Sequence, residues 1–444
     1  MKALLKQKSF FFLLIILALI VVYTKGISPL FNSVFLVTEG LVIFSICYNT
    51  IISVLGLRRQ KRLTIKEPAS KFAIVVAAHN EEAVIGELVK NLKTLHYPNE
   101  LYDVYVICDN CTDKTAKVVR ENVAVAMERF NDKERGKGYA LKWMFDQLWK
   151  LEEEGTSYDA VVVLDADNLV NQDFLSFMNT KLLEGYEVLQ GYLDSKNPKD
   201  TLITKSYAIS YWSNNRMRQL SRQNLGLSAQ LGGTGFVVKT NVLKDLGWNA
   251  TSLTEDVEFT QLYILHKGLP VCWVHEAIVY DEKPLTFIAA WRQKLRWMKG
   301  HADCMFRLTG PIMKQAILKR SLLHFDSALY LLSPSRIALN LVVWMFACLS
   351  FFNLRPSYSI WNIIVSNDTF SYFYLFLLLG IYGIPFIGLI LERKYREIHW
   401  TIPTYFLNLL FIPLSILGIV NRHDKVWSHT KHTRSISIDE ITKE

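Results

Sequence analysis

The sequence has few cysteines and lacks the glycine-rich phosphate-binding motifs of the common nucleotide-binding folds. Its six cysteines are scattered, which argues against a disulfide framework and favours a reducing, cytosolic setting for the polar part of the chain. Cys108 and Cys111 form a single Cys-x-x-Cys with no second pair or histidine pair at metal spacing, so no zinc site is expected. The absence of a Gly-x-Gly-x-x-Gly turn and of a P-loop leaves an ordinary dehydrogenase or kinase without support.

Charge is also scarce in long runs towards the two ends of the chain. Half of the 444 residues are hydrophobic and the mean hydropathy is +0.16, whereas residues 58–320 have the composition of a soluble domain. The net charge of +9 could suggest nucleic acid as a partner. However, basic residues cluster beside the apolar runs, at Arg58–Arg62 and Arg393–Arg396, and this placement is typical of cytoplasmic membrane flanks. We therefore expect a lipid bilayer and no nucleic acid.

The apolar runs are long enough to cross a membrane, which takes about 20 residues. Phe10–Tyr23 and Gly26–Leu57 predict an outward-and-return hairpin that leaves the central domain in the cytosol. The C-terminal runs are Ile337–Leu354, Thr369–Leu391 and Ile402–Val420. Three crossings would export the basic tail, against the positive-inside tendency. One segment is then re-entrant or interfacial, or a further crossing exists.

These features divide the chain into five regions. Residues 311–332 alternate apolar and basic side chains and predict a helix either on the membrane surface or packed on the soluble domain. The predicted regions are a transmembrane hairpin (1–57), a cytosolic domain (58–310), an amphipathic interface helix (311–332), a C-terminal transmembrane region (333–421) and a cytosolic tail (422–444).

Within the central domain, three apolar strands end in polar residues. Phe72–Ala78 runs into His79-Asn80-Glu81-Glu82, Tyr102–Cys108 runs into Asp109, and Ala160–Leu164 runs into Asp165-Ala166-Asp167. Strands alternating with helical patterns predict a mostly parallel α/β sheet. Ligands of such sheets bind at the carboxyl ends of the strands.

Asp165 and Asp167 stand one residue apart directly after a buried strand. Two carboxylates so placed can bind one divalent ion, and hard oxygen ligands suit Mg²⁺ or Mn²⁺. The alternative is that Asp167 or Asn168 only caps the following turn. The position after an apolar strand favours the metal site.

A series of motifs in this order resembles the family-2 glycosyltransferases, specifically their membrane-integrated processive branch of cellulose, hyaluronan, chitin and poly-N-acetylglucosamine synthases. The matching motifs are Ala78-His79-Asn80-Glu81-Glu82, Asp109, Gly136-Lys137-Gly138, Asp165-x-Asp167, Gly233-Thr234-Gly235, Thr254-Glu255-Asp256 and Gln293-x-x-Arg296-Trp297. The resemblance implies a GT-A domain with a mixed, mostly parallel sheet inserted between transmembrane helices.

The resemblance also implies roles for single residues. Asp256, with Glu255 beside it, would be the catalytic base, and Asp165 and Asp167 would hold the metal. The nucleotide-sugar would contact Ala78, Glu81, Asp109, Lys137, Asp165, Gln293 and Arg296. The acceptor would contact Gly233, Thr234 and Trp297, and the tail residues Trp427, Thr430 and Lys431 would gate the nucleotide.

Plainer interpretations stand beside these roles. Lys137 could be a solvated loop charge, Asp109 a turn cap, and Glu255 and Asp256 an acidic first turn that the helix dipole favours. Arginine and tryptophan on an amphipathic helix at a membrane also need no catalytic purpose. The tail after Arg422 could be a disordered basic segment attracted to anionic lipid.

The resulting prediction is a multi-pass plasma-membrane enzyme with a cytoplasmic catalytic domain. It would polymerise UDP-glucose or UDP-N-acetylglucosamine into a β-linked polysaccharide by an inverting mechanism and export the chain, with accessory subunits as possible partners. The alternative is a membrane enzyme that adds one sugar to a polyprenyl phosphate or glycolipid. Gln293, Arg296 and Trp297 favour the first.

Overall fold

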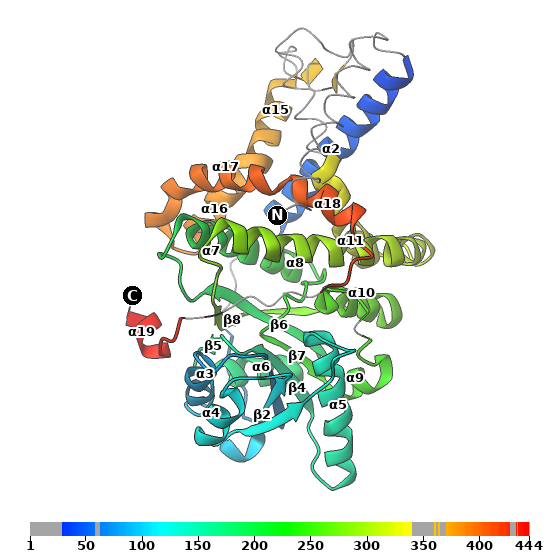
Figure 1. Cartoon of the computed structure of the whole chain (residues 1–444). Coiled ribbons are helices and arrows are strands. Elements are labelled where there is room, and N and C mark those ends of the chain that lie inside the picture. The colour runs from blue at the N-terminus through cyan, green and yellow to red at the C-terminus, as the bar shows by residue number, and fades with distance from the viewer. Residues whose placement is uncertain are drawn as a thin grey trace. The chain divides into compact units, whose positions relative to one another are not determined.

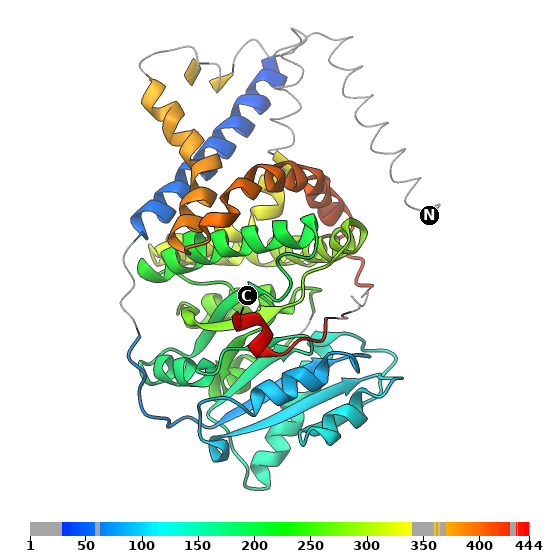
Figure 2. The same cartoon turned by 90° about the vertical axis from the view of Figure 1, so that its left-hand side faces the viewer.

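The computed structural model describes residues 29–57, 63–249, 251–339, 359–360, 363–364, 370–426, 432 and 434–443. The chain forms two compact units, one from residues 1–50 and 336–382 and the other from residues 51–335 and 383–444. Figures 1 and 2 show the described elements in two views. The second unit contains the central domain.

An eight-stranded sheet forms the centre of the second unit, in the order β3-β2-β1-β4-β7-β6-β8-β5. The neighbours β3, β2, β1 and β4 are parallel, β7 runs antiparallel to both of its neighbours, and β8 pairs parallel with β6 and antiparallel with β5. The strands are β1 (Phe72–Ala78), β2 (Tyr102–Asp109), β3 (Val125–Arg129), β4 (Ala160–Asp165), β5 (Leu169–Val170), β6 (Val188–Ser195), β7 (Phe236–Lys239) and β8 (Cys272–Asp281). The three predicted strands and the mixed, mostly parallel sheet are confirmed.

Helices cover both faces of this sheet. The helices that cover the sheet, or that pack on the covering helices, are α3 (Ile85–Leu92), α4 (Thr115–Glu121), α5 (Lys137–Glu153), α6 (Phe174–Leu183), α7 (Leu202–Asn214), α8 (Ser221–Asn224), α9 (Thr240–Leu246), α10 (Glu255–Lys267), α11 (Phe287–Leu318) and α12 (Leu322–Leu331). A 3-10 turn, η1 (Asn99–Leu101), precedes β2, and a π-helical stretch, η2 (Asn215–Leu220), joins α7 to α8. The remaining helices are α2 (Pro29–Leu55), α15 (Ser371–Leu378), η4 (Leu379–Gly383), α16 (Ile384–Leu391), η5 (Tyr395–Trp400), α17 (Thr401–Phe411), α18 (Pro413–Val420) and α19 (Ile438–Lys443).

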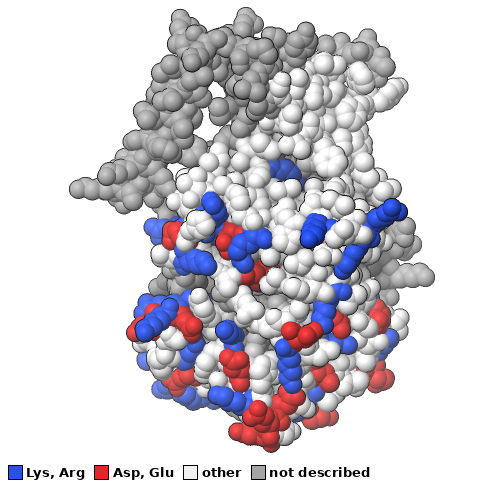
Figure 3. All heavy atoms as spheres, turned by 90° about the vertical axis from the view of Figure 1, so that its right-hand side faces the viewer, with Lys and Arg blue, Asp and Glu red and all other residues white. Residues whose placement is uncertain are grey.

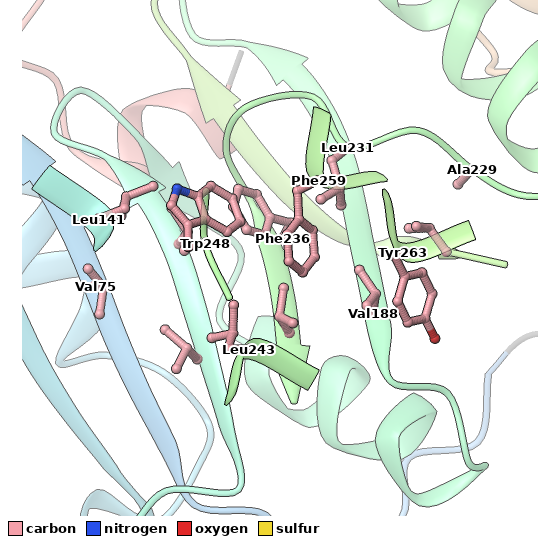
Figure 4. Close-up of a cluster of buried hydrophobic side chains, with 14 of the residues drawn as sticks. Val75, Leu141, Val188, Ala229, Leu231, Phe236, Leu243, Trp248, Phe259 and Tyr263 are labelled. Carbon is pink, nitrogen blue, oxygen red and sulfur yellow. The ribbon is translucent and has the colours of Figure 1, made fainter. Parts of the chain in front are cut away.

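Strand β1 shows why its sequence is almost wholly apolar. Ala73 and Val75 pack into one hydrophobic cluster with α5, α7, α9 and α10, while Ile74 and Val76 pack into a second with α3, α4 and α6. Figure 4 shows part of the first cluster, where Trp248 lies against Phe236. A strand buried on both faces needs apolar side chains at consecutive positions. Each such side chain contributes about 1.5–3 kcal/mol to the free energy of folding.

The predicted interface helix of residues 311–332 is divided in the structure. Its first part is the end of α11, which continues through Pro311 to Leu318, and its second part is α12. Arg320 between them has a left-handed φ of 49°. The Ser321 hydroxyl then accepts the N–H of His324 and caps the new helix. The local turn chemistry, which the apolar pattern does not encode, separates the two helices.

Three described helices have the length and apolar composition of a membrane span: Phe35–Leu55, Tyr372–Leu391 and Tyr395–Val420. They overlap three of the predicted runs. Phe10–Tyr23 and residues 340–354 of the predicted Ile337–Leu354 lie outside the described residues, so the number of crossings stays a prediction. In the first unit, Glu39, the only charge in its run, accepts hydrogen bonds from the Ser359 hydroxyl (2.7 Å) and the Ile360 N–H (2.6 Å). These bonds satisfy a carboxylate that would otherwise be costly there.

A buried ion pair holds α12 to α8. The Arg222 guanidinium donates two hydrogen bonds to the Asp326 carboxylate, at 2.8 and 3.0 Å. We expect Asp326→Asn to lower the free energy of unfolding by about 3–5 kcal/mol, because it leaves a buried cation without its counter-charge. Thermal unfolding in detergent should show a Tm roughly 6 °C lower or more. Glu121→Gln, which breaks the exposed pair with Lys117, is the control and should leave Tm unchanged; an equal small effect of both substitutions would contradict the prediction.

Candidate active site

A cleft of about 400 Å³ opens at the carboxyl ends of β1, β2 and β4. This volume is within the usual range of small-ligand sites. Every predicted site residue that the structure describes lines the cleft: Ala78, Glu81, Asp109, Lys137, Asp165, Asp167, Gly233, Thr234, Glu255, Asp256, Gln293, Arg296 and Trp297. The predicted gating residues Trp427, Thr430 and Lys431 lie outside the described residues.

At the β1 and β2 end of the cleft, Asp109 is buried and ion-paired. Its Oδ1 accepts a hydrogen bond from Arg129 at 2.6 Å, and both side chains are almost fully enclosed. The backbone carbonyl of Asp109 contacts Nδ1 of His79 at 2.7 Å. The carboxylate therefore joins β2 to β3 and faces the cleft, so it is more than a turn cap.

At the β4 end, the Lys137 ammonium bridges two loops. Its Nζ donates to Oδ1 of Asp165 and, at 2.5 Å, to the carbonyl of Gly233. Lys137 begins α5 after Gly136, whose φ of 111° few other residues adopt. Burial opposes the charged form of Lys137, but the carboxylates of Asp165 and Glu255 outweigh it and raise the pKa. The interpretation of Lys137 as a solvated loop charge is therefore wrong.

Asp167 is the deeper of the two paired carboxylates. Its Oδ2 accepts the backbone N–H of Glu282 at 2.7 Å. Burial alone would raise the pKa of Asp167, but His432 and the Glu282 N–H lower it, so the side chain stays anionic. Asp167 thus makes contacts within the cleft that a turn cap does not require.

Two further carboxylates, Asp281 and Glu282, follow β8 into the same wall. Burial, with the negative charges of Asp167 and Asp165 nearby, raises the pKa of Asp281 to about 6 despite its ion pair with Lys283. The wall therefore gathers four carboxylates, those of Asp165, Asp167, Asp281 and Glu282, which are hard oxygen donors. A divalent ion such as Mg²⁺ or Mn²⁺ fits that donor set.

The Gly233 loop lies against both the paired carboxylates and the start of α10. Gly233 has a φ of 83°, and a Cβ placed on it would lie 3.5 Å from Oδ2 of Asp256. The Thr234 hydroxyl accepts the Asp165 N–H at 3.0 Å and donates to Oδ1 of Asn168. Thr234 is buried with its hydroxyl engaged inside the protein, and so it positions the Asp165 turn.

Glu255 and Asp256 form the first turn of α10 at the floor of the cleft. Burial, followed by the negative charge of Glu255, raises the pKa of Asp256 to about 7. Burial also raises the pKa of Glu255, against the pull of Lys137. Both side chains are half-buried, and their raised pKa values distinguish them from a solvated acidic turn that only complements the helix dipole.

Helix α11 passes this floor because of a glycine. A Cβ on Gly300 would lie 2.6 Å from the backbone nitrogen of Thr254, the residue before α10. Only glycine permits that approach. It brings the face with Gln293, Arg296 and Trp297 to the cleft.

The three side chains of this α11 face differ in their contacts. Gln293 accepts a hydrogen bond from the Tyr207 hydroxyl at 3.1 Å, and the Trp297 ring lies 6.4 Å from the Tyr207 ring, centre to centre. Within the described part of the chain, the Arg296 guanidinium makes no hydrogen bond or ion pair, so it can bind an anion in the cleft.

Other cleft residues were not predicted. Among them are, besides Asp281 and Glu282, Tyr211, His301, Tyr330 and His432. Asp281 follows an apolar strand and could have been found by the rule that found Asp165. His432 ends the tail segment in which Trp427, Thr430 and Lys431 are predicted to gate the nucleotide, although no role was predicted for it. Its Nδ1 lies 2.9 Å from the Glu81 carboxylate, and its pKa rises to about 10 because Asp167 and Glu81 outweigh the effect of burial.

Comparison with known proteins supports the geometry. Residues 68–300 match the family described as "Glycosyltransferase like family 2". The chain is 26% identical to the probable glycosyltransferase YdaM of Bacillus subtilis, over 66% of this chain and 71% of that protein. It is 31% identical to the beta-monoglucosyldiacylglycerol synthase of Nostoc, over 60% of this chain and 57% of that protein. It is 25% identical to the poly-beta-1,6-N-acetyl-D-glucosamine synthase of Staphylococcus epidermidis, over 57% of this chain and 60% of that protein.

The chain thus matches less than two thirds of the Nostoc and Staphylococcus proteins. Among solved structures, the mannosyltransferase PcManGT of Pyrobaculum calidifontis, in complex with GDP-Man and Mn²⁺, shares the fold with a TM-score of 0.54 at 15% identity. That match covers 88% of this chain and 98% of PcManGT. Because the family match covers more than half of the chain and includes the strands and helices that build the cleft, this protein belongs to the family-2 glycosyltransferases and is a GT-A-fold glycosyltransferase.

Proposed function

We propose that this protein transfers a hexose from a UDP-sugar to an acceptor hydroxyl with inversion, using Asp256 as the general base. The observation that carries the proposal is the position of Asp256, whose half-buried carboxylate shares one cleft with Asp165, Asp167 and Arg296. The acceptor oxygen attacks the anomeric carbon while its proton passes to the Asp256 carboxylate. The bond from that carbon to the diphosphate oxygen breaks, and UDP leaves with the electron pair.

The remaining cleft residues would bind the donor. Ala78, Glu81 and Asp109 lie at the strand edge where a nucleotide is expected. Asp165 and Asp167 would hold Mg²⁺ or Mn²⁺, which when bound neutralises charge on the diphosphate. Lys137 and Arg296 are cations that can face the same diphosphate, since guanidinium and ammonium groups both bind phosphate oxygens.

The acceptor side favours a sugar chain. Trp297 lines the cleft, and a flat aromatic ring offers a stacking surface to sugar rings. We therefore propose a plasma-membrane synthase with a cytoplasmic catalytic domain that polymerises glucose or N-acetylglucosamine into a β-linked polysaccharide and exports it. The 25% identity to a poly-N-acetylglucosamine synthase supports this choice. Accessory export subunits would fit such a role.

The alternative acceptor is a lipid that receives one sugar. The 31% identity to a monoglucosyldiacylglycerol synthase favours it, and an acceptor dissolved in the bilayer would fit a chain with helices of membrane-spanning length. Purified protein in vesicles with and without diacylglycerol or a polyprenyl phosphate, given radiolabelled UDP-glucose or UDP-N-acetylglucosamine and Mn²⁺, separates the two. Polymer supports the first proposal, a single-sugar lipid supports the second, and release of free sugar alone would contradict both.

The reaction should depend on pH through Asp256. A base acts only when ionised, and the pKa of Asp256 is raised to about 7 by burial and by Glu255. We therefore expect kcat/KM to fall about tenfold per pH unit below 7 and to level off above it. Steady-state rates between pH 5.5 and 9 measure this. A profile that stays flat through pH 6–8 would remove Asp256 from the role of base.

Trp297→Ala should weaken the acceptor more than the donor. The substitution removes a stacking surface but leaves Arg296 and the strand-edge residues in place. We expect transfer to the acceptor to fall more than slow hydrolysis of the UDP-sugar, with an unchanged KM for the donor. Trp143→Ala, on α5 away from the cleft, is the control. Equal loss of transfer and hydrolysis would count against stacking.

A further inference from the structure

Residues 395–420 have the length and apolar composition of a membrane span, yet they lie along the catalytic domain. They form three short helices, η5, α17 and α18. At the join of the last two, Ile412 and Ser415 donate to carbonyls only three residues back, and Pro413 has no N–H to donate. Figures 1 and 2 show α17 and α18 beside α7 and α11.

The inner face of this segment is packed on the domain. Leu407, Phe411 and Leu414, spaced i, i+4 and i+7, are buried in one cluster with Tyr207 and Ala290. The Phe411 ring stacks on Phe287 at 5.2 Å. These contacts place the start of α18 against the start of α11.

The two ends of the segment are also fixed to the domain. Glu397 in η5 accepts a hydrogen bond from Lys205 in α7 at 2.7 Å. At the other end, Asp424 accepts one from Lys299 in α11 at 2.6 Å. Between them, a Cβ on Gly418 would lie 2.6 Å from Cβ of Met298, so only glycine permits this approach. The chain from Phe411 to Asp424 therefore packs along the first half of α11, from Phe287 to Lys299.

The outer face is apolar and uncovered by described residues. Ile402, Phe406 and Leu410, spaced i, i+4 and i+8, are 59%, 66% and 56% exposed. Exposure of this face to water would be unfavourable, because burying one large apolar side chain stabilises it by about 1.5–3 kcal/mol relative to leaving it in water. The segment is therefore apolar on two sides, with one side filled by the protein.

We propose that residues 395–420 lie in the plane of the membrane surface, with Ile402, Phe406 and Leu410 among the lipid acyl chains. Two observations favour lipid over a protein partner. The segment follows directly after Tyr372–Leu391, a helix of spanning length. The exposed cations Arg393 and Arg396 precede the apolar face, as headgroup contacts require. In this placement the segment does not cross the bilayer. Its apolar residues are needed on both faces, one packed on the protein and one in contact with lipid.

This placement has a consequence for topology. After α18 the chain pairs with Lys299 through Asp424, and His432 reaches Glu81 in the cleft. The tail thus lies on the side of the catalytic domain without another crossing, which resolves the conflict with the positive-inside tendency. The same packing holds α11, with Arg296 and Trp297, at the level of the lipid surface.

Depth in the bilayer tests the proposal. A fluorescent amino acid is introduced by amber suppression at position 402, 406 or 410 of the full-length protein in vesicles of phosphatidylcholine and phosphatidylglycerol. Lipids brominated near the headgroup should quench all three positions, and more strongly than lipids brominated deep in the chain. Position 123, 78% exposed on the catalytic domain, is the control and should not be quenched. In a crossing helix, positions 402 and 410 would differ in depth by about 12 Å.

Three outcomes overturn the proposal: a depth gradient from 402 to 410, no quenching at any of the three, or an exported C-terminus. For the last, a protease-cleavable tag after Glu444 is compared with the same tag inserted at the exposed turn after Glu154. We expect both tags to be cut from the same side of sealed vesicles. Cleavage from opposite sides would require a further crossing.

Discussion

Asp256→Asn is expected to abolish sugar transfer while leaving nucleotide binding intact. Asparagine keeps the shape of the side chain but cannot accept the acceptor proton, and a positioned base contributes about 10²–10⁴-fold to the rate. The substitution should leave the wall of Asp165 and Asp167 unchanged, because Asp256 lies on α10 and, among the described residues, its carboxylate makes no hydrogen bond to either side chain. Transfer is measured with labelled UDP-sugar, and UDP affinity by calorimetry.

A control variant and the UDP affinity distinguish loss of the base from damage to the fold. Asp146→Asn makes the same chemical change on the exposed side of α5 and should keep full activity. Loss of UDP affinity together with transfer would indicate that Asp256→Asn disturbs the fold of the cleft. Full product yield from Asp256→Asn would rule out the proposed mechanism.

Asp165→Asn is expected to reduce transfer by roughly 10²–10³-fold, because a bound metal stabilises the developing charge by several kcal/mol and each 1.4 kcal/mol is tenfold in rate. The change removes one carboxylate of the proposed metal pair and the ion-pair partner of Lys137. The metal concentration for half-maximal activity should rise by about 10–100-fold. Titration of Mn²⁺ and Mg²⁺ at saturating UDP-sugar measures both effects.

The metal dependence separates the two substitutions. High Mn²⁺ should restore part of the activity of Asp165→Asn and none of that of Asp256→Asn, because only the first acts through the ion. Asp146→Asn again serves as the control and should show the metal dependence of the unchanged enzyme. If Asp165→Asn kept its rate at low Mn²⁺, the paired carboxylates would not be the metal ligands.

The sequence alone determined the strands and their polar ends. A strand buried on both faces must be apolar at consecutive positions, so β1, β2 and β4 are legible from composition. Parallel strands end at one edge, which brings Ala78, Asp109 and Asp165 to one cleft. The i, i+3 and i+4 spacing of Gln293, Arg296 and Trp297 likewise fixes one helix face.

Contacts between distant segments were decided only by the tertiary structure. The Cys272–Asp281 strand could have been found, but the approach of α11 to Thr254, just before Asp256, depends on Gly300, which the sequence shows only as an ordinary helix residue. The ion pair of Lys137 depends on the carboxylate of Asp165, which is 28 residues away in the sequence. His432 reaches Glu81 across 351 residues.

The apolar segments show most clearly which properties follow from local sequence and which depend on tertiary contacts. Length and hydropathy depend only on local composition, and they identify residues 395–420 as a possible span. Whether such a helix crosses a bilayer or lies on it depends on what its faces contact. The tertiary structure shows Leu407, Phe411 and Gly418 packed on the catalytic domain, which composition cannot reveal because burial on a protein surface and burial in lipid require the same apolar residues.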